Sequence, residues 1–177
     1  ATWQTLWTQC DQEHLLLQIQ PRLLDLGART GQLAALAVHL EEGLEALGPD
    51  RKALGLLIDL YVSVGDALSA VELAKQVYGQ DTVESLTQQQ RIYLRCHEFG
   101  RCHRVLQRLL QIDPDNTSTY LQQMAVIAVE RGSERDALAA AQAIAQAQDA
   151  DLIDAEYAAG VLAMIGRTAE AARTYEG

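Results

Sequence analysis

Three stretches of the chain share one pattern, in which a glycine is followed five residues later by an alanine: GDALSA at 65–70, GSERDA at 132–137 and GRTAEA at 166–171. Glycine ends a helix readily because it adopts positive φ without strain. A small residue shortly after the turn lets two helices approach closely. Each stretch therefore predicts a helix end, a tight turn and the start of a second helix.

The spacing of the glycines predicts a repeat. Gly31 and Gly65 are 34 residues apart, Gly65 and Gly132 are 67 apart, and Gly132 and Gly166 are again 34 apart. The middle interval is close to twice 34, so a further helix end is expected near residue 99, where the pair Phe99-Gly100 lies. A period of this length is typical of two-helix units stacked in an array.

The composition agrees with an all-helical chain. Of 177 residues, 49% are hydrophobic, Ala, Leu and Gln dominate, and there are one Phe and three Pro. Ala, Leu and Gln lose little side-chain freedom in a helix. No stretch alternates for long between apolar and polar residues, as a half-buried strand would. Pro49-Asp50 and Pro114-Asp115 are expected at joints between units, since proline cannot continue the preceding helix.

Residues 83–116 resemble a unit of the tetratricopeptide (TPR) repeat family. The run from Phe99 to His103 and the run from Leu109 to Asn116, with its Asp-Pro ending, are similar to the family's second helix. Tyr93 and Tyr61 stand where the family often has a first-helix tyrosine. The resemblance implies an all-α fold, a right-handed α-solenoid superhelix of antiparallel two-helix (TPR-like) repeats with about 9–10 helices. The residues that depart from the pattern are Gln89, Gln90, Cys102, Leu36 and Pro21, the last of which lies near the first helix of unit 17–50.

The repeat predicts one array over residues 1–177. The expected repeats cover 17–50, 51–82, 83–117 and 118–151, with a partial unit at 1–16 and a truncated repeat at 152–177. Repeat arrays normally finish with a polar capping helix, and the truncated repeat has none, so the chain is expected to be a slice of a longer solenoid. Self-association through apolar ends, such as the alanine-rich stretch 155–163, is a further expectation.

The net charge of −10 argues against several classes of partner. The chain has 14 Lys and Arg against 24 Asp and Glu, so it is poorly suited to neutralise the phosphates of nucleic acid or of an anionic membrane. The RNA-binding pentatricopeptide repeats, which have a similar period, would need basic grooves throughout. No run approaches the roughly 18 apolar residues of a membrane-spanning helix, and the N-terminus does not read as a secretory signal.

Cys10, Cys96 and Cys102 are too few, and odd in number, to form a disulfide framework. They favour a reducing, cytoplasmic compartment over the periplasm, although a periplasmic helical array would need no disulfides either. The compartment stays open at this point.

Two Cys-His pairs, Cys96-His97 and Cys102-His103, raise the question of a zinc site. Paired ligands of structural zinc sites are typically about two to four residues apart, whereas adjacent residues on a helix point about 100° apart. We therefore expect no metal here: Cys102 packs at a helix crossing and His97 takes the turn. The sequence has no strained nucleophile turn and no Gly-rich phosphate loop, so no enzymatic activity, catalytic residue or cofactor is expected.

In arrays of the TPR family, the first helices line a concave surface that commonly receives a peptide or a partner helix. Arg91 and Arg95 are four residues apart on the first helix of the best-matched unit, and hence on one face. Together with Gln122 and Gln123 of the next unit, they are the candidate contacts for an acidic or C-terminal segment of a partner, because guanidinium groups favour carboxylates. The alternative is that these arginines balance nearby acids such as Glu84 or Glu130.

The unit around these arginines is locally basic in an acidic chain. Its five arginines outnumber its four acids: Arg91, Arg95, Arg101, Arg104 and Arg108 against Glu84, Glu98, Asp113 and Asp115. We therefore interpret the chain as a protein–protein interaction scaffold or adaptor that binds a peptide or partner helix in the concave groove. The alternative is a regulatory or assembly segment of a larger enzyme or of a secretion or envelope machine, with the activity outside this chain.

Overall fold

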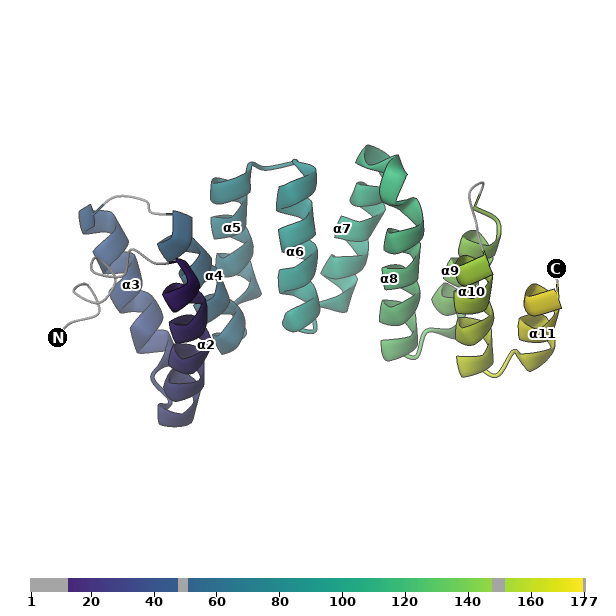
Figure 1. The fold of residues 1–177 in the computed structure, drawn as a ribbon, viewed down its shortest axis with the longest axis horizontal. Helices are drawn as coiled ribbons and strands as arrows, with labels where there is room; N and C mark the ends of the chain where they lie inside the picture. Colours follow the sequence, from purple (N-terminus) through teal and green to yellow (C-terminus); the bar gives the residue numbers. More distant parts are fainter. Residues whose placement is uncertain (1–12, 48–50, 148–151, 177) are drawn as a thin grey trace. The chain divides into compact units, whose positions relative to one another are not determined.

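The chain is built from helices. The computed structural model describes residues 13–47, 51–147 and 152–176, and within these ranges it contains ten α-helices, one short 3-10 helix and no strand (Figure 1). The all-α prediction is confirmed. None of the helices in these ranges is both long enough and apolar enough to cross a membrane. The helices are α2 (Glu13–Thr30), α3 (Leu33–Leu47), α4 (Arg51–Val64), α5 (Ala67–Tyr78), α6 (Val83–Arg95), α7 (Phe99–Ile112), η1 (Pro114–Asn116), α8 (Thr117–Glu130), α9 (Glu134–Ala145), α10 (Leu152–Met164) and α11 (Thr168–Glu176).

Some of the predicted features lie outside the described residues. These are residues 1–12 of the partial unit predicted at 1–16, including Cys10, and the Pro49-Asp50 joint. Residues 13–16 begin α2.

The helices form two compact units, Ala1–Gln80 with α2 to α5 and Asp81–Gly177 with α6 to α11. In both units the helices pack in consecutive pairs, α2 with α3 and α4 with α5, then α6 with α7, α8 with α9 and α10 with α11. The second helix of a pair also contacts the first helix of the next, as α3 contacts α4, α7 contacts α8 and α9 contacts α10. Each pair thus buries its apolar face on a neighbour. We call α2, α4, α6, α8 and α10 the first helices.

Each first helix ends in the same turn. The residues in the left-handed region are Gly31, Gly65, His97, Gly132 and Gly166, with φ of 68°, 82°, 56°, 64° and 81°. Two backbone hydrogen bonds close each turn as a Schellman motif. At Gly65, the N–H donates to the carbonyl oxygen of Val62, and the N–H of Asp66 donates to that of Tyr61. The regular glycine spacing is therefore a spacing of helix ends.

The helix end that the glycine spacing predicts at Phe99-Gly100 is wrong by a few residues. The left-handed residue is His97, whose N–H donates to the carbonyl oxygen of Leu94, whereas Gly100 lies inside α7. Histidine enters this region more often than most side chains do. Its ring also lies edge-on to Phe99, with the centroids 5.7 Å apart. Glycine is favoured at such a turn but not required. The spacing of the glycines alone therefore predicts this turn at the wrong residue.

The residue five positions after the turn is small and buried in four of the five pairs. These residues are Ala70, Cys102 and Ala137, which expose none of their surface, and Ala171, which exposes 9%. Counting from His97 rather than from Gly100 brings Cys102 into this register. The thiol of Cys102 donates a hydrogen bond to the backbone oxygen of Gln90 over 3.5 Å. Cys102 therefore fills the crossing between α6 and α7.

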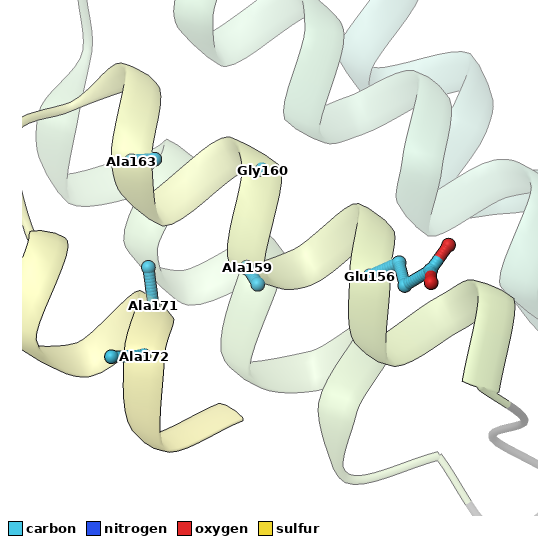
Figure 2. Close-up of a pocket in the computed structure, with 6 residues that line it drawn as sticks. All are labelled: Glu156, Ala159, Gly160, Ala163, Ala171 and Ala172. Atoms are coloured by element: carbon cyan, nitrogen blue, oxygen red, sulfur yellow. The ribbon is translucent and has the colours of Figure 1, made fainter. Parts of the chain in front are cut away.

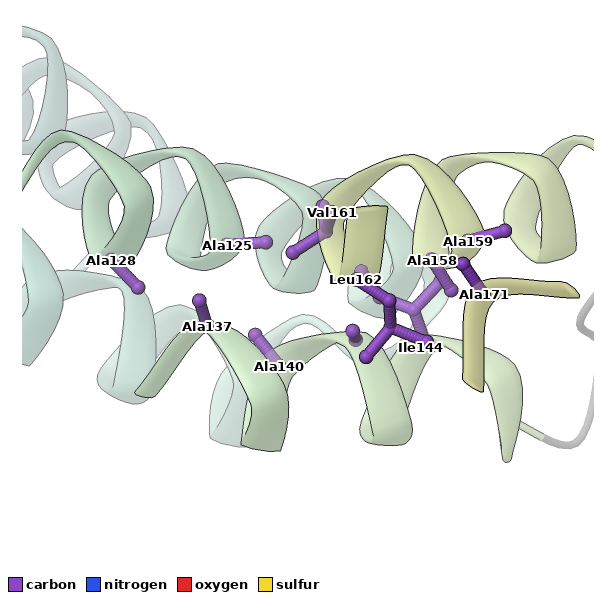
Figure 3. Packing of buried hydrophobic residues seen from close by; sticks show 11 residues of the cluster. Ala125, Ala128, Ala137, Ala140, Ile144, Ala158, Ala159, Val161, Leu162 and Ala171 are labelled. Atoms are coloured by element: carbon purple, nitrogen blue, oxygen red, sulfur yellow. The ribbon is translucent and has the colours of Figure 1, made fainter. Parts of the chain in front are cut away.

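The cores of the two units differ in composition. In the first unit, the buried residues Ala37, Leu56, Leu57 and Leu60 pack together, with Leu36 half-buried against them. In the second unit, the core that joins α8 to α11 is built mainly from alanine, as Figure 3 shows. Its buried members are Ala125, Ala128, Ala137, Ala140, Ala141, Ile144, Ala158, Ala159, Val161, Leu162 and Ala171. Alanine lets the helices of this core pack closely.

The Pro114-Asp115 joint forms the short helix η1 between α7 and α8. The hydroxyl of Tyr120 donates to Oδ2 of Asp113 over 2.6 Å, and Nδ2 of Asn116 donates to the same oxygen over 3.0 Å. Burial and the hydrogen bond to Asp113 raise the pKa of Tyr120 to about 12. The joint is thus tied to α8 by side chains as well as by the backbone.

Candidate functional site

Arg91 and Arg95 lie on the exposed side of α6, one helical turn apart. Leu94 lies beside them and exposes 37% of its surface. Within the described residues Arg91 makes no ion pair, whereas Arg95 has a partner of its own. One face of α6 thus carries two exposed arginines and an exposed apolar side chain.

The other three arginines of this region lie on α7, which is not a first helix. Arg101 pairs with Glu98 at 3.9 Å, and its guanidinium carbon lies 6.0 Å from the ring centroid of Tyr93. Arg104 and Arg108 are exposed and are four residues apart. The local excess of arginine is therefore divided between two helices, and the α7 residues provide a comparison for those on α6.

Gln122 and Gln123 are both half-buried on α8. Nε2 of Gln122 donates to Oδ1 of Asp154 on α10 over 3.0 Å, and the hydroxyl of Tyr157 donates to the backbone oxygen of Gln122 over 3.1 Å. The hydroxyl of Ser118 also donates to Oδ1 of Asp154, which exposes only 7% of its surface. Gln122 therefore joins two first helices. Sequence reasoning missed Asp154 and Ser118 as its partners, because the pairing depends on how α8 and α10 pack.

An exposed apolar residue stands at the matching position of the next first helix. Arg91 and Val126 each precede the left-handed residue of their turn, His97 or Gly132, by six residues. Val126 exposes 46% of its surface. Successive first helices thus offer a guanidinium group and an apolar side chain at equivalent positions, which is chemistry suited to a segment carrying both carboxylates and apolar side chains.

The two Cys-His pairs lie at positions where their members have roles in packing and in a turn. Cys102 is buried, and burial raises the pKa of its thiol to about 11. Cys96 is half-buried, and His97 occupies the turn. Over the described ranges, no group of three or more His, Cys, Asp or Glu is placed to hold a metal ion. The arrangement gives Cys102 a packing role.

An open pocket of about 300 Å³ lies between α10 and α11 (Figure 2). Its lining residues are Glu156, Ala159, Gly160, Ala163, Ala171 and Ala172. The alanine-rich surface expected over 155–163 is narrower than the sequence indicated, because Ala158 and Ala159 expose only 0% and 3% and belong to the core. Gly160 and Ala163 form its exposed side.

Solved structures with a similar arrangement of helices include a protein with TPR-like repeats and MamA. A Podosopora anserina putative kinesin light chain with nearly identical TPR-like repeats has a TM-score of 0.54 at 18% identity, over 93% of this chain and 94% of that one. A crystal structure of MamA has a TM-score of 0.52 at 14% identity, over 86% of this chain and 90% of that one. This chain has the TPR-like helical repeat fold. No protein-family model and no curated protein matches its sequence.

The TPR-like fold accommodates the two glutamines that depart from the repeat pattern. Gln89 and Gln90 expose only 5% and 6% of their surface. Nε2 of Gln89 donates to Oγ of Ser85 over 3.2 Å, and among the described residues no buried side-chain nitrogen or oxygen lacks a hydrogen-bond partner. A buried polar group costs little when it is hydrogen-bonded, so these departures do not disturb the packing of α6.

Proposed function

We propose that this chain is a scaffold or adaptor that binds another protein, holding a peptide or partner helix against its first helices. The observation that carries the proposal is the face of α6 on which Arg91 and Arg95 are exposed beside the exposed Leu94. First helices are where arrays resembling the TPR family commonly receive their ligands. The ligand is an acidic segment that also carries apolar side chains.

The chemistry of this face defines the ligand. A guanidinium group binds a carboxylate through two parallel hydrogen bonds, which gives both attraction and orientation. Leu94 and Val126 supply apolar area for the side chains between the carboxylates. Gln123 adds an amide on α8, whereas the amide nitrogen of Gln122 is engaged with Asp154. We therefore assign direct contact to Arg91, Arg95 and Gln123, and a positioning role to Gln122.

Because the whole chain is acidic, the local positive charge of these arginines matters for attracting an acidic ligand. With a net charge of −10, the chain repels acidic ligands at long range, and only a local positive site attracts them. Such attraction between exposed groups is screened over a Debye length of about 10 Å at 0.1 M salt.

The test uses a short synthetic peptide in which glutamate alternates with leucine, and a counterpart with glutamine in place of glutamate. Affinities for the full chain are measured by fluorescence anisotropy. The double variant Arg91→Ala/Arg95→Ala should bind the glutamate peptide about tenfold more weakly, since each exposed ion pair contributes up to about 1 kcal/mol. The glutamine peptide should bind wild type no better than the double variant binds the glutamate peptide.

The matched control is Arg104→Ala/Arg108→Ala on α7. It removes the same charge from two exposed arginines with the same spacing. Equal losses of affinity in the two double variants would mean that net charge, rather than the face of α6, drives binding, and the proposal would then be wrong. So would unchanged affinity in Arg91→Ala/Arg95→Ala.

A further inference from the structure

The first helices of the second unit differ in chemistry at two equivalent positions, six and two residues before the left-handed residue of each turn. All the residues at these positions are exposed. We call them the first-helix row, which consists of Arg91 and Arg95 on α6, Val126 and Glu130 on α8, and Gly160 and Met164 on α10. The row is basic at α6, mixed at α8 and uncharged at α10.

The first-helix row lies outside the contacts between successive pairs. The helix α10 packs against both α8 and α9, yet Val126 still exposes 46% of its surface and Glu130 is also exposed. These positions of a first helix therefore stay accessible when another pair packs against it. Gly160 and Met164 occupy the same two positions on α10, so their exposure is a property of the repeat.

The α10 end of the row is suited to an apolar side chain. Met164 exposes 75% of its surface, more than any other large apolar residue in the described ranges. One turn earlier, Gly160 has no side chain, and a Cβ atom built there meets no other atom within 4 Å. The flexible thioether of methionine adapts to apolar partners of different shape. Neither residue offers a charge or a hydrogen-bonding side chain.

The middle of the row disfavours a second acidic residue. Glu130 on α8 holds the position that Arg95 holds on α6, so the charge at this position is reversed from one first helix to the next. A carboxylate of the ligand is attracted at α6 and repelled at α8. The part of the ligand that lies over α8 is therefore uncharged.

We propose that the ligand crosses the row as an extended segment, with acidic residues over α6, an uncharged stretch over α8 and an apolar residue against Met164. This inference rests on the proposed function, because the acidic end is the segment that Arg91 and Arg95 bind. Packed helices lie about 8–10 Å apart, so α6 and α10, two first helices apart, are separated by roughly 20 Å. An extended chain rises about 3.3 Å per residue, so the acidic and apolar residues are about six positions apart.

The probes are two synthetic peptides. The leucine peptide carries two glutamates, a spacer of about five serines, which spans roughly 20 Å when extended, and one leucine. The serine peptide has serine in place of this leucine. Affinities for the full chain are measured by fluorescence anisotropy. Wild-type protein should bind the leucine peptide about fivefold more tightly, the gain expected from burying part of one leucine side chain.

Met164→Ser tests where the leucine binds. This variant should bind the two peptides equally, because the apolar partner of the leucine is gone. The matched control is Leu152→Ser, at the opposite end of α10, where the side chain exposes 70% of its surface. The control should keep the fivefold preference. Arg91→Ala/Arg95→Ala should weaken the binding of both peptides and leave their ratio unchanged.

Two further changes test the order of the ligand. A peptide with a single serine as spacer should bind wild type and Met164→Ser equally, because its leucine does not reach α10. A leucine peptide with glutamate at the central serine should bind wild type about twofold more weakly than the parent peptide, as expected for one repulsion between exposed charges. Glu130→Gln should remove this difference.

The outcomes separate this inference from the proposed function. Equal binding of the two peptides by wild type, or a preference that survives in Met164→Ser, would show that the ligand does not reach α10. So would loss of the preference in Leu152→Ser as well as in Met164→Ser. If Arg91→Ala/Arg95→Ala still weakens binding in these cases, only the present inference is wrong. If that double variant binds both peptides like wild type, the proposed function and this inference are both wrong.

Discussion

The amide nitrogen Nε2 of Gln122 in α8 donates a hydrogen bond over 3.0 Å to Oδ1 of Asp154 in α10. The carboxylate exposes 7% of its surface and also accepts from Ser118. This bond therefore holds two successive first helices at a fixed distance and orientation. It is a partly buried polar contact between two helices that also share a core built mainly from alanine.

Removing Gln122 should destabilise the second unit. Gln122→Ala leaves a buried carboxylate short of one donor, which lowers the free energy of unfolding by about 1–2 kcal/mol. The measurement is urea denaturation followed by circular dichroism. Gln123→Ala, at the adjacent half-buried position, is the control and should change stability by less than about 0.5 kcal/mol. A similar loss in both variants would show that the bond to Asp154 contributes nothing particular.

Two glycines of the second unit should respond to alanine in opposite directions. Gly132 has φ of 64°, so Gly132→Ala forces a side chain into the left-handed region and should cost about 1–2 kcal/mol. Gly100 lies inside α7 with open space around its Cα, so Gly100→Ala should stabilise by up to about 1 kcal/mol. Thermal melts of the two variants check the signs. If Gly100→Ala were destabilising, the left-handed turn would have to lie at Phe99-Gly100, as the glycine spacing predicts.

The N-cap of α5 should make stability depend on pH. The carboxylate of Asp66 accepts hydrogen bonds from the backbone N–H and the hydroxyl of Ser69, at 3.1 and 2.7 Å, and these bonds lower its pKa. The stabilisation from the charged form is therefore present above the ordinary aspartate value of about 3.9 and is lost as the pH falls through the lower, folded-state pKa.

Two variants separate the cap from its charge. Asp66→Ala removes the cap and should cost about 1 kcal/mol at pH 7, whereas Asp66→Asn keeps a capping oxygen without the charge. The urea midpoint of wild type should exceed that of Asp66→Asn at pH 7, and the difference should shrink as the pH falls below the ordinary aspartate pKa of about 3.9. A difference that stays constant over this range would contradict the pKa direction.

The thiols of Cys96 and Cys102 should differ in reactivity. Burial raises the pKa of Cys102 to about 11, so its reactive thiolate is scarce at pH 8, and the side chain is inaccessible in the crossing of α6 and α7. Cys96 is half-buried. Under native conditions, iodoacetamide should label Cys96 much faster than Cys102, as followed by mass spectrometry of the digested protein. Equal rates in folded protein, as expected after denaturation, would contradict the packing role of Cys102.

The sequence predicts the fold well where residue type and backbone conformation coincide. Gly65, Gly132 and Gly166 take positive φ, so their spacing reveals the ends of the first helices. The glycine spacing alone misses the turn at His97, where a non-glycine residue takes the left-handed conformation. The expectations drawn from the Cys-His pairs, that His97 takes the turn and that Cys102 packs at the helix crossing, are both confirmed.

The residues of the candidate binding surface could be predicted only in part from the sequence. Helical spacing alone places Arg91 and Arg95 on one face, and the structure adds the exposed Leu94 beside them. The pairing of Gln122 with Asp154 joins residues from different repeats and depends on the packing of α8 against α10.

The proposed binding of an acidic segment at Arg91 and Arg95 can be mapped residue by residue. Nuclear magnetic resonance of the ¹⁵N-labelled chain, at 19.4 kDa, follows its titration with the alternating glutamate–leucine peptide. We expect saturable shifts centred on Arg91, Leu94, Arg95 and Val126, which disappear in Arg91→Ala/Arg95→Ala. Shifts centred on Arg104 and Arg108 of α7, or no saturable shifts anywhere, would mean that the acidic segment does not bind at this site.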